Sequence, residues 1–389
     1  MSSHLRSLWV FIPFFIAPCL FSNTPVFENW YGEGYLDCGY ETVEVPGGGY
    51  LITGYRGFDN YNDIYLVRVD AAGNVLWSKL YGGEFWDNGF TIAPASNGNF
   101  LVGGRRFLTS STTSGEPCLM EVTPDGSVQW DADFGSSDKD GCMSVVQTSD
   151  GGCLFTGQYN YADIWVLKTD ASGNEIWSET FGPGGGNGVM EASDGSCYAT
   201  GTSTDLGGEL FLVKLDPASG STRWISTAGD AVGKDCGRGL CESHDGGVIV
   251  AGFTDSFGAG GYDAYVVEFS PEGEILNSRT YGSSENDLAY SIARLPDGYI
   301  LAGKSNSSGA GDYDGYLVRL DRNLDVLWTE TYGGSAADSF NDVFVDTAGN
   351  LVCTGSTSSF GIEGDVYFVV VEDAGVREVP IAARALHAP

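Results

Sequence analysis

The sequence is poor in basic residues. Lysine and arginine together number 19 among 389 residues, against 52 aspartates and glutamates, and the formal net charge is −33. Binding to phosphates depends on clustered lysine and arginine, so this composition argues against nucleic acid or an anionic membrane surface as a partner. Histidine is equally scarce, with three residues, and no Cys-x-x-Cys motif is present. These absences argue against a zinc site built from cysteine and histidine.

Signatures of catalysis are also missing. There is no Gly-x-Ser-x-Gly motif, and no glycine-rich loop that leads into a helical segment. The only long hydrophobic run extends from Leu8 to Phe21, after His4 and Arg6. It is short for a membrane span, and its position predicts a signal peptide over residues 1–23. We therefore expect an exported protein without a membrane span.

A repeated unit occupies most of the remaining chain. One position of this unit is tryptophan in five copies, and Phe27 and Asn277 occupy it in two weaker copies. The five tryptophans are Trp77, Trp130, Trp177, Trp224 and Trp328. Successive positions are separated by 50, 53, 47, 47, 53 and 51 residues. Short strands that repeat with a period near fifty are typical of β-propellers, so the sequence predicts an all-β fold with seven blades.

Each unit contains four segments with the alternation expected of antiparallel strands. In the first unit these are residues 39–45, 50–55, 64–70 and 75–81, separated by turns rich in Gly, Asn and Asp. The last unit lacks a good fourth strand, but residues 27–32 match residues 328–333. We therefore expect the N-terminal strand to complete the last blade and close the ring, which leaves no free sheet edge between blades.

These motifs resemble the secreted bacterial β-propeller repeat family often called SBBP. The resemblance covers about residues 27–375 and is carried by patterns such as Trp328-x-x-x-Tyr-Gly-Gly-Ser335 and Asp346-x-x-Gly-Asn350. It implies a propeller fold and an extracellular setting, and it brings no catalytic residues. Val69-Asp-Ala-Ala-Gly-Asn-Val-Leu-Trp77 is more weakly similar to the repeats of quinoprotein propellers. The predicted domains are a propeller over residues 24–378 and a linker or tail over residues 379–389.

Acidic residues recur on the face of the disc that carries the longer connections. One set begins the first strand of each unit: Asp37, Asp87, Asp140, Asp235, Asp287 and Asp338. The second set precedes the third strand: Asp63, Glu116, Asp163, Glu209, Asp263, Asp314 and Asp365. Such residues commonly accept backbone N–H bonds in their own turns, and they could alternatively bind Ca²⁺. Asp59, Asn62 and Asp63 form the richest local oxygen cluster and are the candidate metal site.

Ligand-binding candidates come from departures from the repeat. Phe85, Trp86 and Asp87 place two adjacent aromatic rings beside a carboxylate, an arrangement that suits sugars and extended peptides. The rare basic residues provide the other candidates: Arg105 and Arg106 with the neighbouring Phe107, and Lys234 with Arg238. Arg238 lies on a predicted channel-lining strand, where it could pair with an aspartate of a neighbouring blade or capture a ligand carboxylate.

The sequence therefore predicts a non-catalytic, monomeric binding or display protein, secreted or at the cell surface, whose partner is carbohydrate or protein. Calcium could assist this binding. Two alternatives remain open: a polysaccharide-active or cofactor-dependent propeller enzyme, and a purely architectural spacer. Eight cysteines follow the signal segment, an even number that permits disulfides in an exported protein, with Cys153–Cys197 and Cys197–Cys241 as pairs that could meet.

Overall fold

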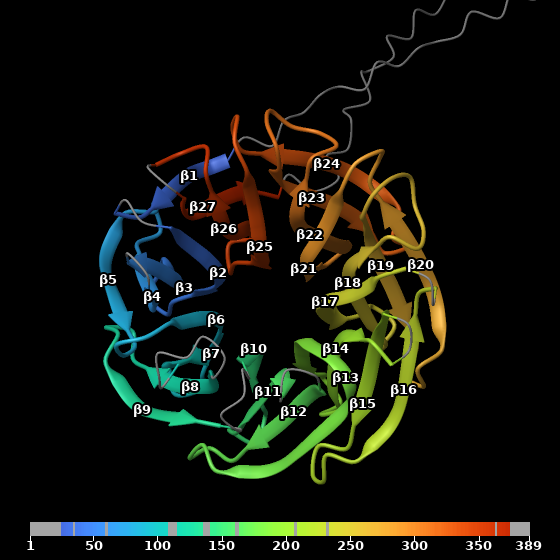
Figure 1. The fold of residues 1–389 in the computed structure, drawn as a ribbon, viewed down its shortest axis with the longest axis horizontal. Coiled ribbons are helices and arrows are strands. Elements are labelled where there is room, and N and C mark those ends of the chain that lie inside the picture. The colour runs from blue at the N-terminus through green and yellow to red at the C-terminus, as the bar shows by residue number, and fades with distance from the viewer. Residues whose placement is uncertain are drawn as a thin grey trace, which may run out of the picture.

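The structure is a computed structural model that describes residues 25–33, 36–58, 61–107, 115–134, 141–159, 163–205, 208–230, 233–361 and 364–373. Within these ranges every regular element is a β-strand, and 27 strands follow one another along the chain. The strands form a ring of sheets that radiate from a common axis (Figure 1). The described part contains no helix with the length and apolar character that a membrane crossing needs. The predicted signal segment and the predicted tail, residues 379–389, lie outside the described residues.

Four sheets each contain four consecutive antiparallel strands, ordered from the axis outward as they occur in the chain. Their strands are β2 (Asp37–Glu44), β3 (Tyr50–Phe58), β4 (Tyr61–Val69) and β5 (Val75–Tyr81); β6 (Asp87–Pro94), β7 (Phe100–Arg106), β8 (Glu116–Val122) and β9 (Val128–Asp133); β17 (Asp235–Glu242), β18 (Val248–Thr254), β19 (Asp263–Phe269) and β20 (Ile275–Tyr281); and β21 (Asp287–Leu295), β22 (Gly298–Ser305), β23 (Asp314–Asp321) and β24 (Val326–Tyr332). The expected strand boundaries agree with these bounds to within a few residues.

A larger, seven-stranded sheet follows the second of these units. Its strands are β10 (Gly141–Gln147), β11 (Cys153–Tyr159), β12 (Asp163–Thr169), β13 (Glu175–Glu191), β14 (Cys197–Ser203), β15 (Glu209–Leu215) and β16 (Thr222–Ala228). Strand β13 has 17 residues; its part up to Pro183 pairs with β12, and its part from Gly184 pairs with β14. The shortened repeat at this point therefore removes a connecting loop, and one strand runs from the outside of the ring to the inside.

The last sheet combines the two ends of the propeller. Its order is β1 (Pro25–Tyr31), β27 (Asp365–Glu372), β26 (Asn350–Thr357) and β25 (Asp338–Val345). Strand β1 pairs antiparallel with β27, with Trp30 opposite Tyr367. The expected match between residues 27–32 and the fourth strand of the other units is confirmed by this pairing.

Adjacent sheets pack through buried apolar side chains, and the repeated tryptophan lies at the outer end of this contact. Trp177 is buried, and its Nε1 donates to the carbonyl oxygen of Pro217 in the next unit at 3.1 Å. A Cβ atom added to Gly220, whose φ is +71°, would lie 2.6 Å from the Trp177 ring. The ring therefore docks on a turn that only glycine permits without a clash. Trp224 contacts Gly273 in the same way.

The unit with Asn277 in place of tryptophan differs in both partners of this contact. The facing turn carries Leu324, the one described non-glycine residue with positive φ (+66°), where other units have glycine. Asn277 donates to the carbonyl oxygen of Asn323 at 3.2 Å, and Tyr281 donates to that of Leu324 at 2.8 Å. Hydrogen bonds thus replace the aromatic contact at this junction.

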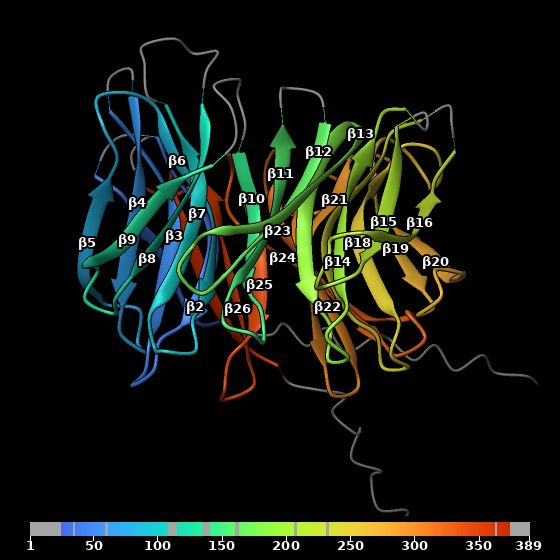
Figure 2. The same cartoon turned by 90° about the horizontal axis from the view of Figure 1, so that it is seen from below.

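The two faces of the ring carry different connections, which Figure 2 displays from the side. Tight turns such as those at Gly98 (φ +85°) and Gly246 (φ +81°) join the first two strands of a unit on one face. Longer connections, such as residues 82–86 and 255–262, lie at the other ends of the strands. The innermost strands begin at this loop-bearing face.

Candidate functional site: the central channel

Every innermost strand carries a β-bulge at the same point of its pairing with the second strand. The bulged residues are Tyr40, Phe90, Met143, Asn187, Arg238, Tyr290 and Asn341. A bulge leaves one residue unpaired and changes the direction of its side chain. All seven residues line one cavity of about 810 Å³ around the axis of the ring. The bulges therefore bring side chains from the whole chain into a single channel.

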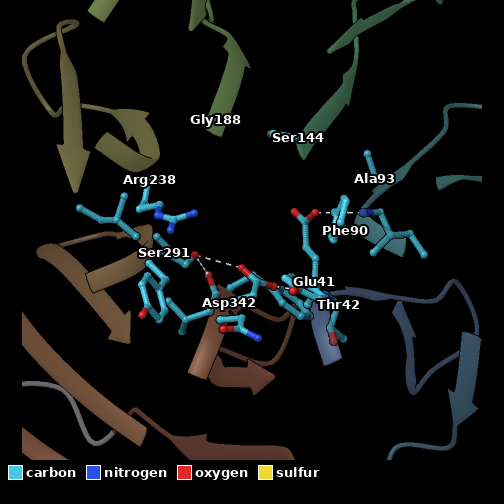
Figure 3. Close-up of a pocket in the computed structure, with 18 of the residues that line it drawn as sticks. Glu41, Thr42, Phe90, Ala93, Ser144, Gly188, Arg238, Ser291 and Asp342 are labelled. Atoms are coloured by element: carbon cyan, nitrogen blue, oxygen red, sulfur yellow. Dashed lines mark hydrogen bonds between the residues drawn. The ribbon is translucent and has the colours of Figure 1, made fainter. Parts of the chain in front are cut away.

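Glu41 and Asp342 lie in the channel wall, which Glu44 also lines, and the sequence interpretation missed these acids. Glu41 and Asp342 each follow the bulged residue of their strand, and Figure 3 shows them on neighbouring parts of the wall. Glu41 Oε2 accepts the backbone N–H of Ile92 at 2.9 Å. Asp342 accepts the hydroxyl of Ser291 at 3.0 Å and the backbone N–H of Thr42 at 3.2 Å.

Burial raises the pKa of both acids. The pKa of Glu41 rises to about 8, through desolvation and then through the neighbouring Asp342 carboxylate. The pKa of Asp342 rises to about 6, mainly through desolvation, against which the Ser291 and Thr42 hydrogen bonds act. Both acids therefore favour the protonated form more strongly than they would in water.

The hydrogen bonds of these acids belong to a pattern that links neighbouring units. In the next two units, the residues at the same position are Thr91 and Ser144. Thr91 accepts the N–H of Val145 at 3.1 Å, and Ser144 accepts that of Val189 at 3.3 Å. The acids, the threonine and the serine thus cap inner-edge N–H groups of the following strand. This shared role gives Glu41 and Asp342 a structural function that requires no catalytic activity.

Arg238 presents a cation to the channel from β17. Its guanidinium carbon lies 5.4 Å from the ring centre of Tyr290 and 5.8 Å from that of Phe253. Its Nε atom is buried without a hydrogen-bond partner, and the described residues form no ion pair with it. The described residues therefore do not form the alternative that the sequence left open, a salt bridge between Arg238 and an aspartate of a neighbouring unit. Aromatic rings hold this side chain in place instead.

Lys304 is a second channel cation that sequence reasoning missed. It lies on β22, with its Nζ 4.4 Å from the ring centre of Tyr313 and 5.9 Å from that of Tyr290. Tyr290 is therefore flanked by Lys304 and Arg238. The repeat could have indicated this residue. Lys304 occupies the same position on the second strand of its unit as Arg105 and Phe253 occupy in their units.

The other basic candidates are distributed over different surroundings. Arg105 faces the bulged Phe90, with its guanidinium carbon 5.8 Å from the ring centre. Arg106 points to the other side of the strand, where it forms ion pairs with Asp131 and Asp133 at 3.0 and 2.9 Å. Phe107 is buried, and Lys234 is exposed on the connection before β17. Of the predicted basic set, Arg238 alone lines the cavity.

The predicted binding candidate Phe85–Trp86–Asp87 is only partly accessible to a ligand. Asp87 is fully buried and accepts the backbone N–H groups of Gly83 at 2.7 Å and Phe107 at 2.9 Å. Phe85 is half-buried, and Trp86 is 37% exposed. Trp86 therefore remains as an accessible ring on the loop-bearing face, outside the residues that line the channel.

The recurring aspartates bind turns between neighbouring units. Asp287 accepts from the N–H of Ser283 at 2.8 Å and the hydroxyl of Ser307 at 2.6 Å. Asp338 accepts from the N–H of Gly334 at 2.7 Å and the hydroxyl of Ser359 at 2.6 Å. These contacts agree with the turn-capping interpretation. Asp37 differs, because neither of its buried oxygens accepts a hydrogen bond of good geometry from the described residues, and burial raises its pKa to about 7 against the lowering effect of Arg56.

The candidate metal residues are Asp59, Asn62 and Asp63. Asp59 lies outside the described residues, and Asn62 donates its amide to Asn88 at 3.0 Å. Burial raises the pKa of Asp63. The part of the chain that the structure describes contains no group of three or more His, Cys, Asp or Glu residues arranged to hold a metal ion.

The eight cysteines after the signal segment are all unpaired, which corrects the disulfide expectation. Seven are buried, and Cys241 is partly buried. Cys153 and Cys197 pack in the cores of different junctions, so they do not meet. Burial raises the pKa of Cys153 and of Cys197 to about 11, which keeps both as inert thiols.

No protein-family model matches the sequence, and no curated protein matches it. Solved structures do, at low identity. The Dos1 propeller has a TM-score of 0.52 and 12% identity, over 85% of this chain and 77% of that one. A protein of unknown function from Dyadobacter fermentans has a TM-score of 0.51 and 11% identity, over 90% and 98%. The extracellular domain of a putative hybrid two-component system from B. thetaiotaomicron has a TM-score of 0.52 and 12% identity, over 90% and 43%.

These likenesses define the class of the protein as a β-propeller of four-stranded antiparallel sheets. They extend to the fold alone, because the identities are too low to transfer a ligand or an activity. The resemblance to the SBBP family is supported at the level of the propeller fold. Function must therefore be argued from the channel of this chain.

Proposed function

We propose that the chain is a closed seven-bladed propeller that acts as a non-catalytic, monomeric binding protein outside the cell. The count of seven follows when β13 is divided between two blades, and β1 then closes the ring. Export is supported by the apolar N-terminal run and by an extracellular domain among the similar structures. The partner is an extracellular carbohydrate or protein that enters from the loop-bearing face.

The observation that carries this proposal is the channel itself. A cavity of about 810 Å³ is large enough for a small ligand or for the end of a longer one. Its wall combines the aromatic faces of Tyr40, Phe90 and Tyr290 with the cation of Arg238. Such a combination of flat apolar surfaces and a few oriented polar groups is typical of binding sites.

A binding screen with matched variants tests this proposal. Residues 24–389 are screened against neutral and acidic polysaccharides and against immobilised peptides and proteins. Met143 lines the channel and carries no charge, so Met143→Trp fills the cavity without altering its electrostatics. We expect saturable binding that Met143→Trp abolishes and Trp86→Ala leaves intact. Binding that only Trp86→Ala abolishes would place the site on the rim instead.

An enzymatic role is the second candidate, and the acid pair of the channel favours it. Glu41 and Asp342 have different raised pKa values in one cavity, which is a common arrangement for acid–base chemistry. Their shared role as inter-blade caps argues for the structural explanation. Release of reducing ends from polysaccharides by the wild type, lost in Glu41→Gln and Asp342→Asn, would establish the enzyme. Calcium dependence is a separate proposal, tested by thermal melts with EDTA and with millimolar Ca²⁺.

A further inference from the structure

We infer that the channel takes an acidic oligosaccharide of the uronic-acid type, and that Arg238 and Lys304 hold one of its carboxylates beside the ring of Tyr290. This inference rests on the proposed binding function and names its ligand class. It depends on three features of the channel: two cations without acidic partners, aromatic faces next to them, and inner strand edges that are already capped.

The two channel cations, Arg238 and Lys304, are half-buried. About half of the described basic side chains that are buried or half-buried form ion pairs, as Arg106 does with Asp131, Lys168 with Asp150 and Arg319 with Asp297. Among the described residues, Arg238 and Lys304 have no carboxylate within ion-pair distance. They belong to a chain whose net charge is −33. A cation that is kept unpaired under these conditions is available for a ligand anion.

The geometry of the cations suits a carboxylate. The Arg238 guanidinium lies near the rings of Tyr290 and Phe253, which restrict its movement, so its planar donor groups lose little freedom when a ligand binds. Lys304 adds a second charge near Tyr290, with its Nζ 5.9 Å from the ring centre. A guanidinium binds a carboxylate through two parallel hydrogen bonds, and the ammonium group adds a donor without a fixed direction.

The inner strand edges favour a carbohydrate over an extended peptide. A peptide main chain is usually recognised by free N–H and C=O groups of a strand edge. In this channel several inner-edge N–H groups already donate to side chains of the preceding blade, as Ile92 does to Glu41, Thr42 to Asp342 and Val145 to Thr91. The rings of Tyr40, Phe90 and Tyr290 line the cavity, and the ring surfaces that face it suit the apolar faces of sugars.

Two acids in the same cavity restrict the charge of the ligand. Glu41 and Asp342 line the same cavity as Arg238 and Lys304. Sugar hydroxyls can donate to these acids, whereas a second carboxylate at that wall would be repelled. A ligand carboxylate is therefore expected next to the cations, and ligand hydroxyls are expected to donate to the acids.

The test uses isothermal titration calorimetry with three probes: trigalacturonate, its methyl ester and a triglutamate peptide. Trigalacturonate should bind the wild type, and its ester should bind at least tenfold more weakly. Arg238→Gln should lose at least tenfold in affinity for trigalacturonate, and Lys304→Met about fivefold to tenfold. Lys234→Met removes one exposed cation outside the cavity and should bind like the wild type. Arg238→Lys should retain part of the affinity, because the charge remains but the planar donors do not.

Several results would overturn the inference. Equal binding of acid and ester by the wild type would remove the carboxylate requirement without reference to any variant, even if Arg238→Gln failed to fold. Binding of triglutamate in preference to trigalacturonate would assign the cations to a peptide. No binding of trigalacturonate would refute the ligand class. If other members of the wider screen still bound in a channel-dependent manner, the proposed function would survive; if none did, it would fail too.

Discussion

Replacing Glu41 by glutamine should stabilise the protein at alkaline pH and leave its stability unchanged at acidic pH. The glutamine oxygen can still accept the N–H of Ile92, so the cap on the next blade is kept. The substitution removes the ionisation of a buried acid whose pKa is raised from 4.5 to about 8. Because the folded state binds the proton more tightly than the unfolded state, the wild type loses stability as pH rises from about 4.5 to 8.

The magnitude follows from the size of this shift. One pKa unit corresponds to about 1.4 kcal/mol, which gives an upper limit of about 5 kcal/mol for Glu41. Part of this cost depends on Asp342, because its neighbouring carboxylate contributes to the raised pKa of Glu41. We therefore expect Glu41→Gln to be more stable than the wild type by about 2 kcal/mol at pH 8.5 and by less than about 0.5 kcal/mol at pH 4.

Urea unfolding followed by tryptophan fluorescence at the two pH values measures this difference, provided that the slope of the transition is unchanged. Glu44→Gln is the matched control, because it removes one acidic group from the same strand, where Glu44 accepts the N–H of Thr347 at 2.8 Å. A gain at pH 8.5 in both variants would indicate relief of general charge repulsion. If Glu41→Gln showed the same stability difference at both pH values, the reasoning about its ionisation would be refuted.

Three further predictions concern the scaffold. Trp177→Ala should reduce the free energy of unfolding by about 3–5 kcal/mol, because a buried ring that docks on Gly220 is lost; urea unfolding measures this, with the partly exposed Trp30→Ala as the control. Asp287→Ala should cost about 1–3 kcal/mol in the same assay, since the N–H of Ser283 and the hydroxyl of Ser307 lose their acceptor, whereas Asp287→Asn, which keeps one acceptor, should cost less. Deletion of residues 25–31 removes β1 and exposes the edge of β27, so light scattering should detect association that the full ring lacks; a monodisperse deletion variant would contradict this role of β1.

The sequence predicted the ring because its local code is repeated. Most units have a large residue that docks on a turn glycine of the next unit, and that pairing recurs in Trp177 with Gly220 and Trp224 with Gly273. The pairing of the N-terminal strand with the last unit was predictable for the same reason, since Phe27 contacts the turn at Gly73 as the tryptophans contact theirs. Repetition makes such contacts visible in a single sequence.

The contents of the channel were less accessible to sequence reasoning. Arg105 and Arg106 are adjacent, yet neighbouring strand residues face opposite sides, so one lies near Phe90 and the other pairs with Asp131 outside the channel. The bulge before Glu41 changes the expected alternation by one residue, and a bulge has no strong signature within one repeat. Glu41, Lys304 and Asp342 differ from the residues at the same positions of other units, and this difference is visible only when the units are matched at their bulges.

The departures from the repeat also explain why the channel, rather than the rim, is the better candidate. Positions that serve the scaffold hold the same residue type in most blades, as the turn-capping Asp287 and Asp338 do. The bulged positions do not, because they hold tyrosine, phenylalanine, methionine, asparagine and arginine in a ring whose backbone is repeated. Packing of one blade on the next does not require this variety, and two of its members, Asn187 and Asn341, already donate to carbonyl oxygens of the following blade at 2.8 Å. The remaining bulged side chains, with Arg238 among them, are those that a ligand in the channel would meet.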